Sequence, residues 1–216
     1  PRGVVLQSCA RGPERGRGRH CVRERHRQRE GAGDLRERMT TYIAVPRAVK
    51  VGGRVVKMAN LRAGLSQKGS GDVESQIQSG NLRLSTGLRS AAKVEAALET
   101  ALGEVCGFSV RALVRTPAQL GELASYGVGL TAPFGGDVRR YVTFLKVDPD
   151  AELVATLNGW DLPGERAHVN GREVYLWYSH PSHEAKLSNA RIERGGVVAT
   201  TRDLKVVSAL AEKWGT

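Results

Sequence analysis

The chain has 216 residues, 40% of them hydrophobic, which is enough for a packed core in one large or two small domains. No apolar run reaches membrane-spanning length, and the odd set of Cys9, Cys21 and Cys106 does not suggest a disulfide framework. These features argue against a membrane protein and a disulfide-rich secreted protein. We expect a protein of the reducing cytoplasm, with no membrane partner.

The formal net charge of +11 is concentrated near the start of the chain. Residues 1–38 hold eleven Arg and five acidic residues, and thus six of the eleven net positive charges. Such an Arg-rich segment with few apolar residues cannot offset its ordering entropy. Two interpretations remain open: a disordered basic leader that contacts nucleic acid, or sequence upstream of a true start at Met39.

The stretch MTTYIAVPRAVKVGG, residues 39–53, organises the rest of the chain. Its β-branched and aromatic run over 40–45 predicts a strand buried on both faces. Pro46 lacks the N–H that a sheet ladder needs, so regular pairing should weaken there. Arg47 and Lys50 then precede Gly52 and Gly53, and a basic glycine loop after a strand can offer N–H groups to an anion.

Hydrophobic spacing, turn residues and capping residues predict the elements of residues 58–126. Ser79-Gly80-Asn81 suits a tight hairpin, and Thr116-Pro117-Ala118-Gln119 is a capping box with proline at the first helical position. The predicted elements are a helix over 58–68, strands over 72–79 and 81–85, a helix over 89–106, a strand over 108–114 and a helix over 116–126.

The glycine-rich stretch 126–137 precedes a second series of similar elements. Asn170-Gly171 between two apolar runs is a strong hairpin signal. The predicted elements are a strand over 138–147, a helix capped by Asp148-Pro149 and ending at 157, strands over 165–169 and 173–178, a helix over 184–194, a strand over 197–200 and a helix over 202–214.

The element order βαββαβ plus a helix therefore occurs twice, which predicts an α+β protein of two tandem ferredoxin-like units. We expect an Arg-rich leader over 1–38, a first unit over 39–127, a linker over 128–137 and a second unit over 138–216. In such a unit helices cover one face of the sheet and leave the other face for a partner or for the second unit.

Five segments together, VPRAVKVGG, KMANLR, IQSGN, KLSNARIER and ATTRDLKVV, resemble the bacterial proteins grouped as domain of unknown function 1697. The resemblance covers about Met39 to Trp214. It implies two tandem ferredoxin-like α/β units, in agreement with the element order, and no established activity.

The chain departs from that family's usual residues in three motifs. Ala48 and Lys50 stand where the family usually has Gly and Asn, and Gln76 replaces a usual Tyr. In the last motif, Asp203, Leu204 and Lys205 replace a usual Asn-Trp-Asn. The resemblance thus implies an altered site, if these positions form one.

A composite anion site is the leading functional hypothesis. The turn from the last strand into the last helix carries two hydroxyls and an arginine, and a helix N-terminus favours anions. The alternative is that Thr201 simply caps the helix. The candidate ligand-binding residues are Arg47, Lys50, Gly52, Gly53, Lys57, Gln78, Ser79, Asn81, Thr200, Thr201 and Arg202.

The ligand class is a phosphate-bearing molecule or a nucleic acid. Tyr175 and Trp177, with Tyr141 and Phe144 on the neighbouring strand, could stack bases on a sheet face, or they could form core. A further alternative is an enzyme acting on a small phosphorylated or carboxylated metabolite in the cleft between the units.

No catalytic constellation stands out in the sequence. Cys106 lies on the apolar edge of a helix and is expected to pack in the core. His180, His183 and Glu184 are expected to be solvated rather than to bind a metal. We expect no cofactor.

Overall fold

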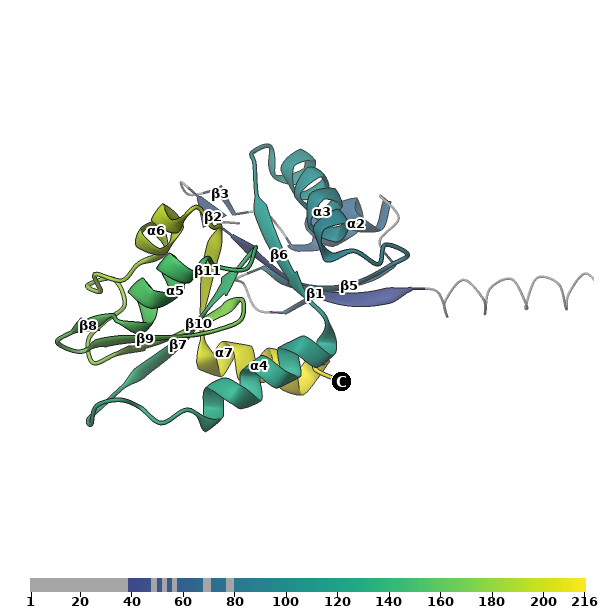
Figure 1. Ribbon diagram of the computed structural model, residues 1–216. Helices are drawn as coiled ribbons and strands as arrows, with labels where there is room; N and C mark the ends of the chain where they lie inside the picture. Colours follow the sequence, from purple (N-terminus) through teal and green to yellow (C-terminus); the bar gives the residue numbers. More distant parts are fainter. Residues whose placement is uncertain (1–38, 48–49, 52–53, 56–57, 68–70, 77–79) are drawn as a thin grey trace, which may run out of the picture. The chain divides into compact units, whose positions relative to one another are not determined.

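A computed structural model describes residues 39–47, 50–51, 54–55, 58–67, 71–76 and 80–216. The two interpretations of residues 1–38 concern a segment outside the described residues. Residues 39–216 form one compact unit. It has a mixed α/β fold with two antiparallel sheets, which confirms the expected class at that level (Figure 1).

The first sheet has the strand order β4-β5-β1-β6, with every neighbouring pair antiparallel. A separate two-stranded ribbon, β2-β3, follows β1 along the chain. The elements are β1 (Thr40–Arg47), β2 (Lys50–Val51), β3 (Arg54–Val55), α2 (Met58–Gln67), β4 (Gly71–Gln76), β5 (Asn81–Thr86), α3 (Ala91–Cys106), β6 (Arg111–Arg115) and α4 (Pro117–Gly129).

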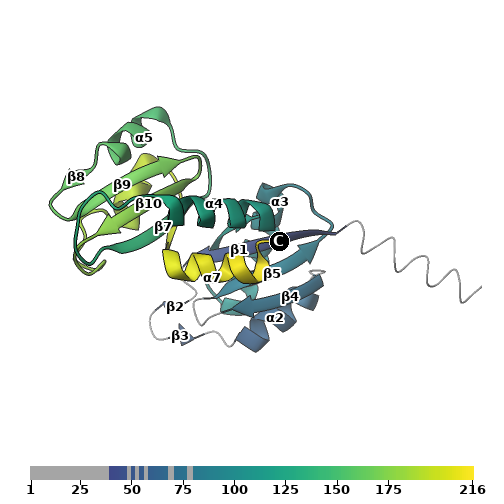
Figure 2. The same cartoon turned by 90° about the horizontal axis from the view of Figure 1, so that it is seen from below.

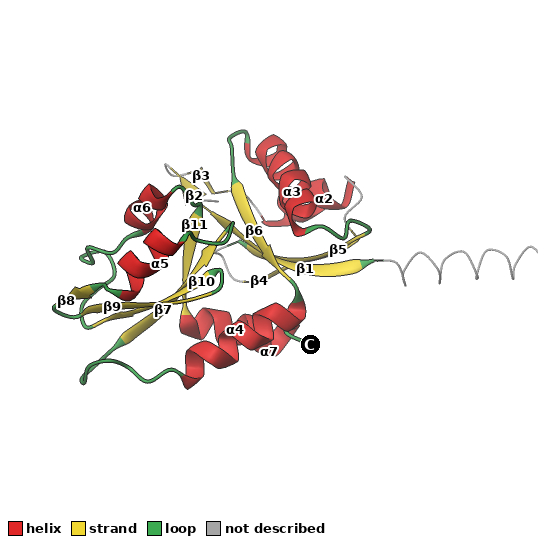
Figure 3. Ribbon diagram, in the orientation of Figure 1, coloured by secondary structure: helices red, strands yellow, loops and turns green. Residues whose placement is uncertain are grey.

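The second sheet has the order β11-β7-β10-β9-β8 and is also antiparallel throughout (Figure 3). The elements are β7 (Arg139–Leu145), α5 (Ala151–Asn158), β8 (Asp161–Leu162), β9 (Glu165–Asn170), β10 (Glu173–Tyr178), α6 (Asn189–Ile192), the 3-10 turn η1 (Glu193–Gly195), β11 (Ala199–Asp203) and α7 (Leu204–Trp214). None of the helices in the described ranges is long and apolar enough to cross a membrane.

Strand β1 is buried on both faces, as its nearly continuous apolar sequence predicts. Tyr42 and Ala44 pack with α2 and α3 on one face. Ile43 and Val45 face the opposite way and pack into a second core cluster. The period of two in a strand therefore places β1 between two separate apolar layers.

Helices α4 and α7 pack side by side and form a middle layer between the two sheets (Figure 2). This core includes Val45 and Leu113 from the first sheet and Phe144 and Trp177 from the second. Helices α5 and α6 cover the other face of the second sheet. The division into units over 39–127 and 138–216 stays a prediction, and the middle layer packs against elements of both.

Local turn and cap signals are confirmed at three places. Gly80 and Gly171 both have positive φ, at 82° and 58°, where a side chain would be strained. They lie in the turns just before the returning strands β5 and β10. The Thr116 capping box is formed, with reciprocal bonds between Thr116 and Gln119.

The helix predicted over 184–194 is wrong over its first five residues. The buried carboxylate of Glu165 accepts the backbone N–H groups of Lys186 (2.7 Å) and Leu187 (3.0 Å). Burial disfavours the charged form of Glu165. The hydrogen bonds from these two N–H groups and from the Trp160 indole together have the larger effect, so the pKa of Glu165 is lowered. Since the carboxylate holds this backbone in a loop, the helix begins only at Asn189.

Several further boundaries differ from the predicted ones, including that of the strand predicted over 108–114, which is Arg111–Arg115. Helix α4 continues beyond the predicted end at Tyr126 and ends at Gly129. Helix α5 is capped by Asp150, which accepts the N–H of Leu153 at 2.8 Å, and not by Asp148-Pro149. Strand β11 continues to Asp203, so α7 begins two residues later than predicted.

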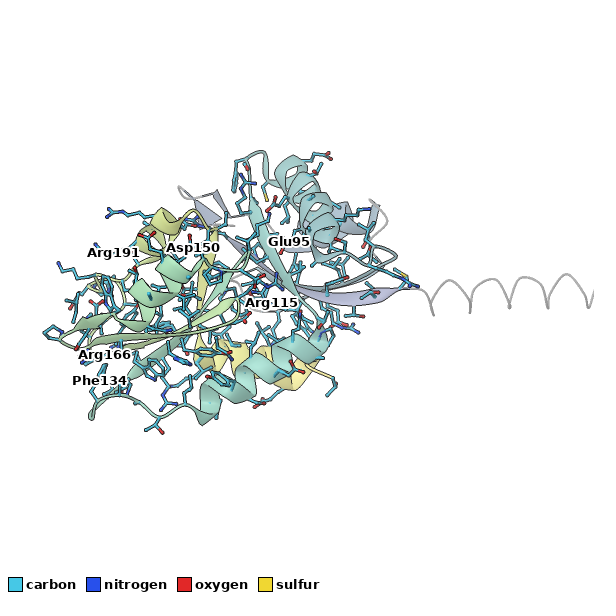
Figure 4. All side chains as sticks on the ribbon, viewed as in Figure 1. Glu95, Arg115, Phe134, Asp150, Arg166 and Arg191 are labelled. Atoms are coloured by element: carbon cyan, nitrogen blue, oxygen red, sulfur yellow. The ribbon has the colours of Figure 1, made fainter. Side chains whose placement is uncertain are left out.

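Two carboxylates from α3 accept hydrogen bonds from backbone N–H groups along the unpaired edge of β6. Glu95 accepts the N–H of Val114, and Glu99 accepts the N–H of Ala112, each at 3.0 Å. Lys146 of the segment after β7 donates to Glu99 at 2.5 Å and lies 4.0 Å from Glu95. Because unpaired strand edges promote aggregation, these contacts protect the first sheet where it approaches the second (Figure 4).

Packing in the middle layer predicts that alanine substitution has different effects on stability at two glycines of α4. A Cβ on Gly127 would lie 2.7 Å from the Tyr175 ring and 3.0 Å from Leu204, whereas Gly129 faces open space. We expect Gly127→Ala to lower the free energy of unfolding by about 1–3 kcal/mol through overpacking. Gly129→Ala, the matched control, should be neutral or slightly stabilising. Equal melting temperatures for the two variants would contradict this packing.

Glu95 predicts a pH dependence of stability. Burial raises its pKa above the usual value, despite the Val114 N–H and the nearby Lys146 and Arg115. The folded state therefore binds the proton more tightly, so stability falls as pH rises from the unfolded pKa through the folded pKa. Glu95→Gln keeps an acceptor for Val114 without a charge, and we expect a higher melting temperature than the parent at neutral pH.

The measurement is the melting temperature of both proteins between pH 4 and 8 in steps of about half a unit, a range chosen to cover the carboxyl titration. The two curves should converge at the acid end, where Glu95 is protonated in both folded and unfolded chains. Glu212→Gln, at an exposed position of α7, is the control for loss of one carboxylate. Parallel curves for Glu95→Gln and the parent would contradict the prediction.

Candidate functional site

Arg202 connects the ends of three strands from both sheets. Its Nε donates to Oδ1 of Asn81 at 3.2 Å, at the start of β5. One terminal nitrogen donates to the Pro46 carbonyl at 2.7 Å, near the end of β1. The other donates to the Thr200 hydroxyl and the Thr201 carbonyl, at 3.0 and 2.9 Å. Residues from three separate sequence motifs thus meet at one guanidinium.

The local sequence explains why the Pro46 carbonyl is available. Pairing between β1 and β5 ends at Ala44 and Leu82, while pairing between β1 and β6 continues to Arg47. Proline has no N–H with which to extend the β5 ladder. The weaker strand pairing expected at Pro46 therefore occurs on the β5 side alone. On that side the Pro46 carbonyl accepts a hydrogen bond from the Arg202 side chain instead.

Arg202 is partly buried, and no carboxylate among the described residues forms an ion pair with it. Burial lowers the pKa of its guanidinium to about 10. Its acceptors in the described part of the chain are carbonyl, amide and hydroxyl oxygens, all neutral. Four of the five N–H donors of a guanidinium are thus engaged, and the positive charge is compensated only by dipoles.

Arg47 lies one residue beyond Pro46 and has a different environment. It forms an ion pair with Glu193 of η1. The same carboxylate oxygen of Glu193 accepts the N–H of Ala199 at 3.0 Å, at the start of β11. Arg47 therefore helps to attach the end of β1 to the second sheet, and its charge is balanced by a carboxylate.

The two threonines of the last motif point to opposite sides of β11. Thr200 is buried and contacts Arg202, as its parity in the strand requires. Thr201 faces the other way and lies 2.6 Å from both the Thr143 hydroxyl and Oδ1 of Asn189. Thr201 therefore belongs to the packing between β11, β7 and α6, and not to the Arg202 cluster.

Thr201 does not cap α7, contrary to the alternative considered for it. The cap is Asp203, whose carboxylate accepts the N–H of Lys205 at 2.8 Å. A carboxylate already occupies this helix N-terminus, which disfavours a second anion there. The helix-terminus argument for an anion site is therefore wrong for this chain, and the case for Arg202 rests on its own surroundings.

The structure brings together three of the predicted ligand-binding residues, Asn81, Thr200 and Arg202, whereas the Arg47 side chain pairs with Glu193. The backbone of Lys50 lies in β2. The remaining candidates, Gly52, Gly53, Lys57, Gln78 and Ser79, lie outside the described residues.

Two residues at this site were missed by the sequence analysis. Glu193 pairs with Arg47, and Asn189 accepts from Thr201. Both lie in KLSNARIER, one of the motifs behind the family resemblance, so the signal was present. Neither was selected because the predicted helix over 184–194 gave no reason to place them beside β11.

The aromatic residues proposed for base stacking are buried in two different cores. Tyr175, Trp177 and Phe144 pack in the middle layer, and all three are at most 6% exposed. Tyr141 packs on the opposite face of the second sheet. The core alternative is therefore correct for these rings, and they cannot stack on bases.

A polar cleft of about 320 Å³ lies between α4 and the β9–β10 hairpin. Arg115 and Glu173 meet at 2.6 Å within it, and Arg115 is 2% exposed. Its remaining lining includes Glu122, Tyr126, Arg172 and Tyr175. The cleft draws residues from both predicted units, which matches the location expected for a metabolite site.

A larger groove of about 750 Å³ lies between the start of β7 and the exposed side of α7. The three positions that depart from the family's usual Asn-Trp-Asn, namely Asp203, Leu204 and Lys205, all line it. Its other charged residues are Asp137, Arg139, Arg140 and Glu212. Basic and acidic side chains are equal in number there, so the groove as a whole favours neither charge.

Neither the cysteine nor the histidines of the described sequence form a reactive cluster. Cys106 packs against the first core, and burial raises the pKa of its thiol. His180 lies 3.4 Å from Glu165, whereas His183 is exposed beside Glu184. In the described part of the chain, no group of three His, Cys, Asp or Glu side chains could hold a metal ion.

Comparison with known proteins supports the family resemblance. A conserved bacterial protein from Streptococcus pneumoniae, whose structure has been solved, matches with a TM-score of 0.58 and 25% sequence identity. The match covers 81% of this chain and 98% of the other. No curated protein matches the sequence. The family model described as "Protein of unknown function (DUF1697)" matches residues 39–175, and the chain belongs to this family.

Proposed function

We propose that this protein binds a small phosphate-bearing anion at Arg202. The observation that carries the proposal is a partly buried guanidinium that donates only to neutral oxygens and has no carboxylate partner among the described residues. Removing a charge from water is costly unless an opposite charge compensates it. An anion beside Arg202 would supply that compensation, and guanidinium groups bind phosphate oxygens well.

Arg115 provides an internal comparison. It is more deeply buried than Arg202 and also donates to backbone carbonyls, but Glu173 pairs with it at 2.6 Å. Within the described residues, the chain therefore balances one buried arginine with its own carboxylate and leaves the other without one. This difference favours a ligand-binding role for Arg202 over a purely structural role.

The same site favours a small ligand over a polynucleotide. Arg202 retains one N–H without an acceptor in the described ranges and lies among Asn81, Thr200 and the Pro46 carbonyl, which leaves room for one contact rather than a long tract. Nucleic-acid sites need a row of cations and exposed aromatic faces. Tyr175 and Trp177 are buried and cannot supply those faces.

Thermal melting in matched salts tests the phosphate proposal. At a phosphate concentration ten times Kd, linkage predicts stabilisation of about 1.4 kcal/mol, or roughly 3–5 °C for a chain of this size. Chloride at the same ionic strength should give no such shift. We expect Arg202→Gln to abolish the shift and Arg89→Gln, which removes an exposed charge of the same sign, to retain it.

Arg202→Gln also removes bonds to Asn81 and Pro46, so its own stability will be lower. The salt comparison on the parent protein does not depend on that variant. Identical melting temperatures in phosphate and chloride, from micromolar to tens of millimolar anion, would overturn the proposal. An undiminished phosphate shift in Arg202→Gln would move the site elsewhere.

Oligonucleotide titration separates this role from that of the Arg-rich leader. We expect the full chain to bind single-stranded DNA with an affinity that falls on the order of 10³-fold between 50 and 200 mM salt, as for several phosphate contacts. The chain from Met39 should bind at least ten times more weakly at low salt. Equal affinity of both chains, weakened by Arg202→Gln, would instead indicate a polynucleotide site in the folded part.

We also propose that the two sheets belong to duplicated ferredoxin-like units. In support, the four main strands follow the same spatial order in each, second-third-first-fourth along the chain, with β8 added at one edge. Helices precede the second and fourth strands in both. The test is an experimental structure in which the two sets of strands are superposed. We expect their helices to lie on the same face, and helices on opposite faces would contradict a duplication.

A further inference from the structure

The cleft between α4 and the β9–β10 hairpin has a rigid, charged floor. Arg115 donates to Glu173 and to the carbonyls of Val114, Leu145 and Arg172, at distances of 2.6 to 3.3 Å. Its guanidinium also lies 5.7 Å from the centre of the Phe144 ring. With bonds from two strands and one carboxylate, the floor is fixed before any ligand arrives.

The rim of the cleft carries two opposite charges that do not neutralise each other. Arg172 comes from the hairpin turn and Glu122 from α4, and both line the same space of about 320 Å³. Among the described residues, neither forms an ion pair with the other or with a third side chain. Oppositely charged groups held apart across a small cleft are suited to a molecule that carries both complementary charges.

The remaining lining suits a small, polar molecule. Gln119 uses its side-chain oxygen to accept the Thr116 N–H, which leaves its amide N–H groups available. Tyr126 lines the cleft and is 39% exposed, whereas Tyr175 is buried and donates its hydroxyl to the Leu123 carbonyl at 2.9 Å. A space of about 320 Å³ equals the volume of roughly ten waters, which is the scale of a free amino acid.

We propose that this cleft binds a free α-amino acid. Its carboxylate would face Arg172, and its ammonium group would face Glu122, with the side chain against the exposed Tyr126. The net charge of the four ionised lining residues, Arg115, Glu122, Arg172 and Glu173, is zero, so a zwitterion matches the cleft better than an anion or a cation does. This site is distinct from Arg202 and does not depend on the phosphate proposal.

The test is a screen of the twenty common amino acids by thermal melting, followed by calorimetric titration of those that raise the melting temperature. For each positive amino acid, the matched amide lacks the carboxylate and the matched deamino acid lacks the ammonium group. We expect both analogues to bind at least tenfold more weakly. A positive result with equally tight analogues would overturn zwitterion recognition.

Two variants assign binding to the cleft. Arg172→Gln and Glu122→Gln should each weaken the amino acid at least tenfold, the first with little effect on the amide and the second with little effect on the deamino acid. Glu122 is exposed and Arg172 is half-buried, so both variants are expected to fold. Arg89→Gln and Glu212→Gln are charge-matched controls that should bind normally.

Arg202→Gln separates the two proposals. We expect it to lose the phosphate response and to retain amino-acid binding, because Arg202 does not line this cleft. If none of the twenty amino acids changes the melting temperature at up to about 10 mM, a concentration far above typical dissociation constants for small metabolites, the proposal is overturned. It is also overturned if a bound amino acid is unaffected by both cleft variants.

Discussion

The apolar layer of α4 and α7 is the constraint on which the described fold depends. Each sheet covers its outer face with its own helices, but its inner face is dry only because this layer packs against it. Burying an aromatic or aliphatic side chain contributes about 1.5–3 kcal/mol, and both sheets contribute several such residues. Separating the sheets would expose them together, which explains why residues 39–216 form one compact unit.

Polar contacts also join the two sheets, and two of them involve arginines. Arg115 joins β6 to β10 through Glu173, and Arg202 joins β11 to the end of β1 through the Pro46 carbonyl. Both arginines hold the sheets in register, but a described carboxylate offsets the desolvation of the first charge alone. A fold selected for stability would gain by pairing both charges, because an uncompensated buried charge is costly. The environment of Arg202 is therefore the feature that stability does not explain.

Much of the local structure could be predicted because its causes are local. The two-sided burial of β1, the Asn170-Gly171 hairpin and the Thr116 capping box each depend on neighbouring residues and formed as expected. The loop over 184–188 could not be predicted because its cause, the Glu165 carboxylate, lies about twenty residues away. Likewise, periodicity showed that the last helix has an apolar face but could not indicate that α4 packs against it. The candidate site was predicted in part for the same reason: Asn81, Thr200 and Arg202 were chosen from two separate motifs, and sequence spacing could not show that Arg202 meets Asn81 and the end of β1. Topology brings them together, because β1 and β5 are antiparallel and the end of one lies beside the start of the other.

Arg202 lies two residues before the first residue of α7, Leu204, which is itself part of the middle core. The core thus determines where the guanidinium reaches the first sheet, and the site is coupled to the packing of the helices. A ligand that favours the observed position of Arg202 must also favour the packed position of α7, because binding and folding are linked. If phosphate binds at Arg202 as proposed, a change in the α4–α7 contact should alter its affinity without touching the ligand.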